Sequence, residues 1–389
     1  SGMLQKSNRP LIYAGGGCMQ SVTGSKELTR FSRTFGIPVV TTLMGIGCYD
    51  TTDPQSLHML GMHGTAYANY AVEDCDFLIA VGARFDDRVA GKVAEFGPNV
   101  KNIAHIDIDA AEIGKVKVPT WSFVGDVGRA LKQLTDYGKG SFKKSFDTWI
   151  KHVQKMKKDH ALNYNRKSPH IQPEEVIEIL NDLTKGEAII STGVGQHQMH
   201  AAQYFDFKHP RTWLTSGSMG TMGFGLPAAI GAQLACPDRI VIDVDGDGSL
   251  RMNLGELETL TTYDIPVKVL LLNNLGDGMV RQWQTLMFDK RYSGTDKSLH
   301  KKDFVKAAQA DGFPFAKRVA DRKVLKKVLK EFVECKHPAF LEVMTDQNAM
   351  VFPMVGPGKG YKDMLVGDHI TPREPAREGA ATIADTSAH

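Results

Sequence analysis

Two short segments of this chain carry side chains that could together hold a divalent cation against a diphosphate. Asp243-Val-Asp-Gly-Asp-Gly-Ser249 follows one apolar run, and Asn273-Asn274 ends another, with 24 residues between Gly248 and Asn273. Mg²⁺ prefers oxygen ligands in octahedral geometry and commonly shares them with phosphates and water. We therefore predict a magnesium site whose protein ligands are Asp247, the Asn274 side chain and the Gly276 backbone carbonyl.

The glycines of the first segment fit the same interpretation. Gly246 and Gly248 lack a Cβ, so the backbone can approach phosphate groups closely. A Gly-Asp-Gly turn alone, or a pair of asparagines alone, would be typical of an ordinary loop. The two at this spacing favour a cofactor site. Asp277 adds negative charge nearby, and we expect its side chain to point away from the phosphates.

A third segment, residues 215–231, contains five glycines and then a helix of small residues that we expect to begin near Pro227. Met222 lies in its flexible part. A bulky apolar side chain there could be the fulcrum for a bent cofactor, or it could be an ordinary core residue, the commoner role of methionine. The residues alone leave both interpretations open.

The elements that position these residues alternate between apolar strand-like runs and helical runs. Strands are expected at residues 10–14, 37–42, 77–81, 103–108, 188–191, 239–244, 267–272 and 339–343. Helices are expected at residues 26–34, 227–235, 254–262, 304–310 and 323–334. Such alternation is typical of parallel sheets with helices on both faces. The predicted fold class is therefore α/β, with two doubly wound parallel-sheet domains.

We divide the chain into five parts. These are a linker remnant at 1–7, a first sheet domain at 8–136, a basic helical connector at 137–170, a second sheet domain at 171–365 and a loose tail at 366–389. The lysines between Lys139 and Lys167 could contact nucleic acid, but a solvated helix face is the more typical explanation.

Composition narrows the class of protein. The net charge of +3 gives no argument for a nucleic-acid partner, and 42% hydrophobic with 23% charged residues is ordinary for a globular protein. The five cysteines are scattered without a CxxC pair, which fits a reducing compartment and argues against a disulfide framework or a zinc site. No apolar run approaches the roughly 20 residues of a membrane helix. The N-terminal residues lack a signal or transit pattern.

The spaced GDG and NN resemble the thiamine diphosphate (ThDP) motif, and longer segments narrow this resemblance. Four of them resemble the catalytic subunit of the acetolactate synthase (acetohydroxyacid synthase) family: Gly82-Ala-Arg-Phe-Asp-Asp-Arg-Val89, His105-Ile-Asp-Ile-Asp109, Gly193-Val-Gly-Gln-His-Gln-Met199 and Gly278-Met-Val-Arg-Gln-Trp-Gln284. The resemblance covers essentially residues 8–365. It implies a central FAD-binding Rossmann-like domain followed by a C-terminal ThDP diphosphate-binding domain.

The resemblance also implies three cofactors, namely thiamine diphosphate, Mg²⁺ and FAD. Met222 would enforce the bent shape of ThDP, Trp283 would shape the acceptor pocket, and Arg88 would lie near the entrance. ThDP and its metal would contact Gln196, His197, Gly220, Thr221, Met222, Asp247, Gly248, Ser249, Asn274, Gly276, Gly278 and Met279. FAD would contact Gly15, Gly16, Gly17, Thr42, Leu43, His63, Gly64, Gly82, Ala83, Arg84, Asp86, Asp107, Ile108, Gly125 and Asp126.

The residues alone leave some of these roles open. Asp107 could equally cap a helix that begins at Ala110. Arg88 could form an ordinary surface ion pair with Asp86 or Asp87, and Trp283 could be a core residue.

The implied activity is acetolactate synthesis, the first common step of valine, leucine and isoleucine biosynthesis. Pyruvate would be decarboxylated, and the resulting enamine would be joined to a second 2-ketoacid, either pyruvate or 2-ketobutyrate. The alternatives are another FAD/ThDP enzyme of the glyoxylate carboligase or pyruvate oxidase type, or a non-catalytic cofactor-binding module. Members of the family form homodimers or homotetramers. A small regulatory subunit is left open, and no nucleic-acid or membrane partner is expected. The location would be cytoplasmic in a bacterium and plastid or mitochondrial in a eukaryote.

The chain departs from the family pattern in several places. His200 stands where the family often has Trp, Ser218-Met219 replaces the usual Gly-Leu, and Leu275-Gly276-Asp277 stands where many members read Gln-His-Leu. Nothing upstream of Arg9-Pro10 corresponds to the family's pyrimidine-binding domain, which supplies the activating glutamate. We therefore expect a fragment that is inactive alone.

Overall fold

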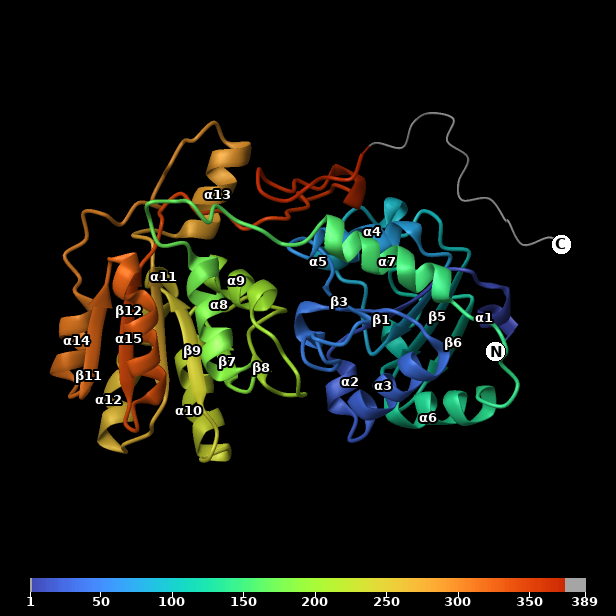
Figure 1. Cartoon of the computed structure of the whole chain (residues 1–389), viewed down its shortest axis with the longest axis horizontal. Helices are drawn as coiled ribbons and strands as arrows, with labels where there is room; N and C mark the ends of the chain where they lie inside the picture. The colour runs from blue at the N-terminus through green and yellow to red at the C-terminus, as the bar shows by residue number, and fades with distance from the viewer. Residues whose placement is uncertain (1, 375–389) are drawn as a thin grey trace.

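The chain forms two α/β domains that lie side by side, as the computed structural model shows for residues 2–374 (Figure 1). Each domain is built on a six-stranded sheet in which every pairing is parallel. The predicted α/β fold class with two doubly wound sheets is therefore confirmed. No helix in this described part of the chain has the length and hydropathy of a membrane span.

The central strands of the first sheet are buried on both faces, as is typical of parallel sheets. Every residue of its two central strands is buried. In order across the sheet the strands are β3 (Ser56–Met59), β2 (Val39–Thr41), β1 (Pro10–Ala14), β4 (Phe77–Val81), β5 (Asn102–Asp107) and β6 (Trp121–Val124).

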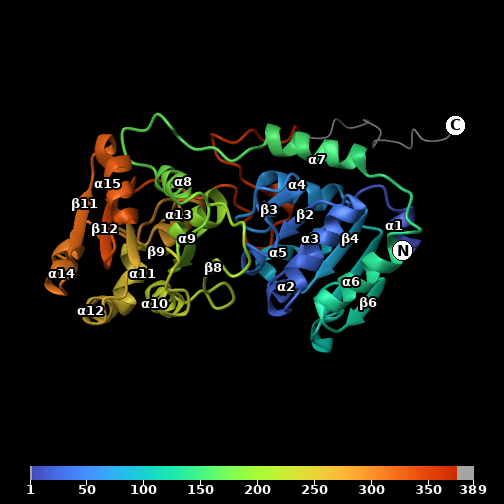
Figure 2. The same ribbon diagram turned by 60° about the horizontal axis from the view of Figure 1, so that its bottom comes forward.

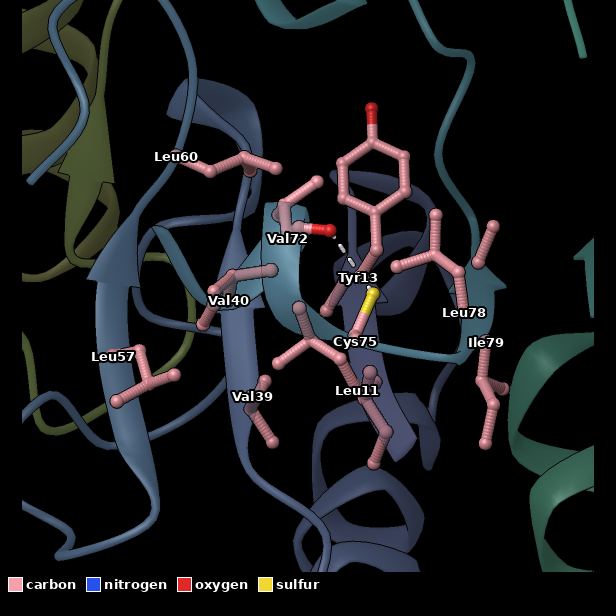
Figure 3. Packing of buried hydrophobic residues seen from close by; sticks show 14 of the residues in the cluster. Leu11, Tyr13, Val39, Val40, Leu57, Leu60, Val72, Cys75, Leu78 and Ile79 are labelled. Atoms are coloured by element: carbon pink, nitrogen blue, oxygen red, sulfur yellow. Dashed lines mark hydrogen bonds between the residues drawn. The ribbon is translucent and has the colours of Figure 1, made fainter. Parts of the chain in front are cut away.

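Helices cover both faces of this sheet. On one face α3 (Gly24–Phe35) packs against α2 (Gly17–Gln20) and α6 (Val127–Gly138), and on the other α4 (Ala66–Asp74) packs against α7 (Asp147–Asp159) (Figure 2). Two short helices, α1 (Gly2–Lys6) and α5 (Asp87–Ala90), lie at its margins. Figure 3 shows the apolar layer between α4 and the strands, where Val72 and Cys75 approach Leu11, Val40 and Leu78.

The second sheet has the same construction. Its strands, in spatial order, are β11 (Phe315–Val319), β12 (Ala339–Met344), β10 (Lys268–Asn273), β9 (Val241–Gly246), β7 (Ile189–Thr192) and β8 (Trp213–Leu214). One apolar cluster joins the sheet to α8 (Pro173–Thr184), α9 (Gln196–Tyr204) and α15 (Arg322–Glu334). A second cluster joins it to α10 (Gly225–Ala235), α12 (Glu256–Thr262) and α14 (Phe304–Ala310). The two short α-helices that complete the domain are α11 (Asp247–Leu250) and α13 (Gly278–Met287).

The segments outside the sheets are more ordered than we expected. In the predicted linker at 1–7, Leu4 is buried and Ser7 Oγ donates to Asp76 Oδ1 at 2.5 Å. The connector forms α7, which buries Trp149, Val153 and Met156 against the first domain while Lys151, Lys155 and Lys158 stay exposed. Residues 366–374 of the predicted loose tail contact the first domain at two points, because Ile370 is buried and Arg373 pairs with Asp74 at 2.9 Å. The rest of that tail, residues 375–389, lies outside the described residues.

Several contacts fix the two domains against each other. Trp213 Nε1 donates to the Leu43 carbonyl at 3.0 Å, and Arg211 Nη2 donates to the Met19 carbonyl at 2.9 Å. Ile46 and Met59 of the first domain belong to the main apolar cluster of the second. The apolar core of the second domain therefore continues into the first domain across their boundary, which we call the domain seam.

Candidate active site

Both sheets place glycine-rich turns where the strand order reverses, which is where ligands of doubly wound sheets bind. In the first sheet the turns after β1 and β4 touch. A methyl group on Gly15 would lie 2.7 Å from Ala83 Cα, and one on Gly17 would lie 2.7 Å from Gly82 Cα. In the second sheet the corresponding turns begin at Gly193, after β7, and at Gly246, the last residue of β9. Only glycine allows these close approaches.

A cavity of about 1110 Å³ opens between the two domains and is lined by residues from both. Arg88 and Trp283, predicted at the entrance and the acceptor pocket, both line it. Gly220 and Met279 of the predicted ThDP set also line it. From the predicted FAD set, the lining residues are Gly15, Gly16, Gly17, Thr42, Leu43, His63, Gly82, Ala83, Arg84, Asp86 and Asp107.

Four residues of the predicted FAD set, Gly64, Ile108, Gly125 and Asp126, do not line this cavity. Ile108 is 72% exposed, and Asp126 caps α6 by accepting from Arg129 N at 2.8 Å. Contact of these four with a flavin stays a prediction.

The geometry decides two alternatives that the residues left open. The cap of the short 3₁₀ helix at Ala110–Glu112 is Asp109, which accepts from Ala111 N at 2.9 Å, so Asp107 is not that cap. Asp86 lies 3.6 Å from Arg84 rather than pairing with Arg88, whose nearest polar contact is Met62 Sδ at 3.8 Å. Asp107 and Arg88 both line the cavity, although Asp107 Oδ1 also accepts from Asp109 N at 3.0 Å.

The GDG turn concentrates buried carboxyl groups. Asp243, Asp245 and Asp247 are almost fully buried, and both oxygens of Asp243 and one of Asp245 have no hydrogen-bond partner in the described chain. Burial raises the pKa of all three groups, that of Asp245 to about 7 and that of Asp247 to about 6. Buried carboxyl groups without partners are costly in their charged form, which is why burial raises these pKa values.

Asn273 and Asn274 make different contacts. Asn273 is structural, because Nδ2 donates to Glu342 Oε1 at 2.7 Å and Oδ1 accepts from Leu275 N at 2.9 Å. Asn274 Nδ2 donates to Gln196 Oε1 at 3.2 Å, which leaves its amide oxygen for a cation. Gln196 is itself anchored, since its Nε2 donates to Gln282 Oε1 and to the Ala349 carbonyl, both at 2.9 Å.

His197 and Ser249, predicted to bind ThDP, hold the surrounding turns together. His197 Nε2 lies 3.4 Å from Asp245 Oδ1, and a methyl group on Gly246 would lie 2.6 Å from its Nδ1. Burial lowers the pKa of His197 to about 3, so the ring is neutral. Ser249 Oγ accepts from Gly223 N at 2.9 Å and from Val194 N at 3.2 Å, which ties two loops to the GDG turn.

Met222 lies at the GDG turn rather than in the large cavity. A methyl group on Gly248 would lie 3.4 Å from Met222 Cε, whereas Met222 is absent from the cavity lining. Thr221 is exposed and donates its backbone N–H to Ser216 Oγ at 2.9 Å. At Gly278, the first residue of α13, an added methyl group would overlap Gln196 Oε1 and Asn274 Nδ2.

Our expectation for Asp277 is wrong. Its side chain reaches toward Gly248, where it is paired with Lys297. The reason is local, because residues 295–297 fold back on residues 275–277 and bring an ammonium group over the turn.

The donor set fits a divalent cation bound together with a diphosphate. In residues 2–374 no group of three or more His, Cys, Asp or Glu side chains is arranged to hold a metal unaided. Asp247, the Asn274 amide oxygen and the Gly276 carbonyl would supply part of an oxygen shell that phosphates and water complete.

Sequence reasoning missed several residues of the site. Lys297, Met44, Gln198 and the Ser216-Gly217 pair were not predicted, yet Lys297 lies at the GDG turn and the others line the cavity. Gln198 is part of the quoted GVGQHQM segment and could have been found there. Nothing in the local sequence marks Lys297 or Met44.

Comparison with known proteins places this geometry in a family. Residues 2–134 match the family described as "Thiamine pyrophosphate enzyme, central domain", and residues 193–343 match "Thiamine pyrophosphate enzyme, C-terminal TPP binding domain". The chain belongs to the thiamine pyrophosphate enzymes. Its matching relatives are acetolactate synthases, so the resemblance seen in the sequence is confirmed.

Three relatives illustrate the similarity, all of them named as chloroplastic. The chain is 45% identical to acetolactate synthase 1 of Nicotiana tabacum, over 93% of this chain and 55% of the relative. It is 46% identical to acetolactate synthase 1 of Zea mays, over 94% and 58%. It is 45% identical to the acetolactate synthase of Arabidopsis thaliana, over 93% and 55%. The chain thus spans little more than half the length of these relatives.

Proposed function

We propose that this thiamine pyrophosphate enzyme chain serves acetolactate synthesis. The reaction would join the two-carbon unit left by decarboxylation of pyruvate to a second 2-ketoacid, either pyruvate or 2-ketobutyrate. The observation that carries the proposal is the cavity beside the glycine-rich turns. Arg88 of the first domain and Trp283 of the second both line it. The similarity to acetolactate synthases along nearly the whole chain supports it.

The cofactors of this proposal are thiamine diphosphate, Mg²⁺ and FAD. When bound, thiamine diphosphate supplies the electron sink that stabilises the carbanion left by decarboxylation. Asp247, Asn274 and the Gly276 carbonyl would hold Mg²⁺, and Gly248 would let the diphosphate approach the backbone. Gly15, Gly17 and Gly82 would contact FAD, because these glycines have no side chain that would keep the cofactor away from the backbone.

The chain's own side chains would then select and orient the substrates. Trp283, partly buried on α13, would form a wall of the acceptor pocket and favour the larger 2-ketobutyrate. Arg88 would draw 2-ketoacid carboxylates into the cavity, since guanidinium groups pair well with carboxylates. The apolar lining formed by Met199, Met279 and Phe288 would exclude water from the reacting groups.

We also propose that two copies of the full-length protein associate. The support is α10, which is apolar along nearly its whole length but buries only one side in this chain. The location would be an organelle in a eukaryote, as the chloroplastic plant relatives suggest, and the cytoplasm in a bacterium.

The proposal is tested by incubating the chain with pyruvate, ThDP, Mg²⁺ and FAD and measuring acetolactate. Because the relatives are longer, the assay is repeated with the region of the tobacco relative that this chain does not match, supplied as a separate polypeptide. We expect acetolactate in the complemented mixture. When 2-ketobutyrate is added beside pyruvate, we expect a lower yield of 2-aceto-2-hydroxybutyrate relative to acetolactate in Trp283→Leu. Turnover of glyoxylate instead, or oxygen consumption with pyruvate, would favour the two related enzyme types. Cofactor binding without any turnover would favour a non-catalytic module.

A further inference from the structure

An ion pair covers the GDG turn at the place where a diphosphate would lie. The Lys297 ammonium is paired with Asp277 Oδ1 directly above Gly248. A methyl group on Gly248 would lie 3.0 Å from Lys297 Nζ and would overlap Asp277 Oδ1. The ion pair therefore occupies the space left by the missing side chain of Gly248. None of the roles described above involves this ion pair.

The backbone holds this pair in place. Asp277 N donates to the Thr295 carbonyl at 3.0 Å, and Lys297 N donates to the Leu275 carbonyl at 2.8 Å. Gly276 and Asp296 pair between these two bonds as an isolated antiparallel bridge. This clamp fixes Lys297 opposite the same short segment that carries the predicted metal ligands. The Lys297 side chain is 13% exposed, so its ammonium is largely withdrawn from water.

The carboxylates around the turn favour an ammonium group at this place. Asp247 is almost fully buried at the turn, and Asp277 Oδ1 and Lys297 Nζ both lie beside Gly248. Two carboxylates thus face the turn beside one well-buried ammonium, and the Asp277 backbone begins α13. A diphosphate would add negative charge at the same point. Without a cation that can move to the diphosphate, the negative charge of Asp277 would repel the diphosphate and weaken its binding.

We propose that Lys297 is a diphosphate ligand of thiamine diphosphate, and that Asp277 is the counter-ion that holds its ammonium at the turn until the diphosphate arrives. The proposal rests on binding of this cofactor at the GDG turn. A lysine ammonium offers three donors on a flexible stem, so it can exchange one anionic partner for another at nearly the same position. Lys297 would then bind phosphate oxygens while Mg²⁺ takes the opposite side through Asp247 and Asn274.

Binding measurements on the whole chain test this directly. ThDP is titrated by calorimetry in the presence of Mg²⁺ into the parent, Lys297→Ala, Lys297→Arg and the control Lys301→Ala, which removes an exposed lysine from the same loop. Loss of a hydrogen bond to a charged group should weaken binding in Lys297→Ala roughly ten- to a hundred-fold. Lys297→Arg should retain most of the affinity, and Lys301→Ala should match the parent. Inorganic pyrophosphate with Mg²⁺ should give the same ranking, because the thiazole and pyrimidine rings are not involved.

A double substitution separates ligand from counter-ion. If Lys297 contacts the diphosphate, Lys297→Ala still weakens ThDP binding when Asp277→Asn is also present. If Lys297 only neutralises Asp277, its loss is harmless once Asp277→Asn has removed the negative charge, and the proposal is overturned. Parent-like affinity in Lys297→Ala also overturns it. Failure of the parent to bind ThDP or pyrophosphate, even with the complementing polypeptide present, would instead reject the proposed function. Circular dichroism and melting curves confirm that each variant is folded.

Discussion

At the scale of single residues, the least expected feature is a buried acid beside a buried imidazole. His200, which stands where the family often has Trp, places Nδ1 3.5 Å from Glu174 Oε1. Burial raises the pKa of Glu174 to about 7 and lowers the pKa of His200 to about 3. Both groups are therefore neutral near pH 6, and the pair is a polar contact inside the core of the second domain rather than an ion pair.

The Glu174 carboxyl group makes stability depend on pH. Its pKa in the folded chain, about 7, lies above the ordinary value of 4.5, so the folded state binds the proton more tightly. That stabilisation is complete below pH 4.5 and is lost as pH rises through 7. Glu174→Gln should flatten the pH dependence between these values and raise the unfolding free energy at pH 8 by at most about 3 kcal/mol.

Urea unfolding at pH 5, 6, 7 and 8 measures this effect. The control is Glu334→Gln, which changes an exposed glutamate whose ion-pair partner is Lys330 and should leave the profile of the parent intact. An unchanged slope in Glu174→Gln would show that Glu174 ionises in the folded chain much as it does in water.

The residue scale also shows how far the sequence alone could lead. The GDG and NN segments were recognisable because their chemistry and spacing are local to two adjacent strands. Lys297 was not recognisable, because its partner lies 20 residues away and is reached only through the backward fold of residues 295–297. For the same reason the direction of the Asp277 side chain was predicted wrongly.

At the scale of elements, apolar strands with long buried runs were predictable and short or exposed strands were not. Strands β1 and β4 begin and end where expected because every residue is apolar and buried. The missed strands β3, β6, β8 and β11 are short, interrupted by polar residues or exposed. Strand β6 is exposed at all four positions and owes its existence to pairing with β5 rather than to burial. Tertiary pairing, which no local pattern reports, decides such strands.

Helix α10 carries a prediction about assembly. It is apolar at every position except Gln233, yet Leu234 remains 65% exposed. An apolar helix face without a partner is typical of an interface. Leu234→Glu should therefore shift the protein toward monomer, because association would bury the new charge. Sedimentation velocity over a range of concentrations measures the shift. Leu299→Glu, which alters an equally apolar but 87% exposed loop residue, should leave association unchanged. A monomeric parent would contradict the proposed dimer.

At the scale of the whole molecule, the site depends on how the two domains are held together. The cavity has walls from both, and its lining includes Leu43, whose carbonyl accepts the Trp213 indole N–H across the seam. Met44, beside it, lies against Gly217 of the second domain, where an added methyl group would be 3.0 Å from Met44 Cγ. The domain seam and the predicted flavin site are thus the same stretch of chain, so loosening one should loosen the other.

Two matched tryptophan substitutions test this coupling. Trp213 Nε1 donates to the Leu43 carbonyl at 3.0 Å between domains, whereas Trp149 Nε1 donates to the Pro10 carbonyl at 2.9 Å within the first domain. Trp213→Phe and Trp149→Phe each remove one buried indole hydrogen bond and should each cost about 1–3 kcal/mol of stability. Only Trp213→Phe should also weaken FAD binding, because only it frees the Leu43 carbonyl at the cavity wall. Flavin fluorescence titration measures the FAD affinity of both variants, and urea unfolding measures their stability. Equal flavin affinity in the two variants would mean that the first domain alone determines the flavin site.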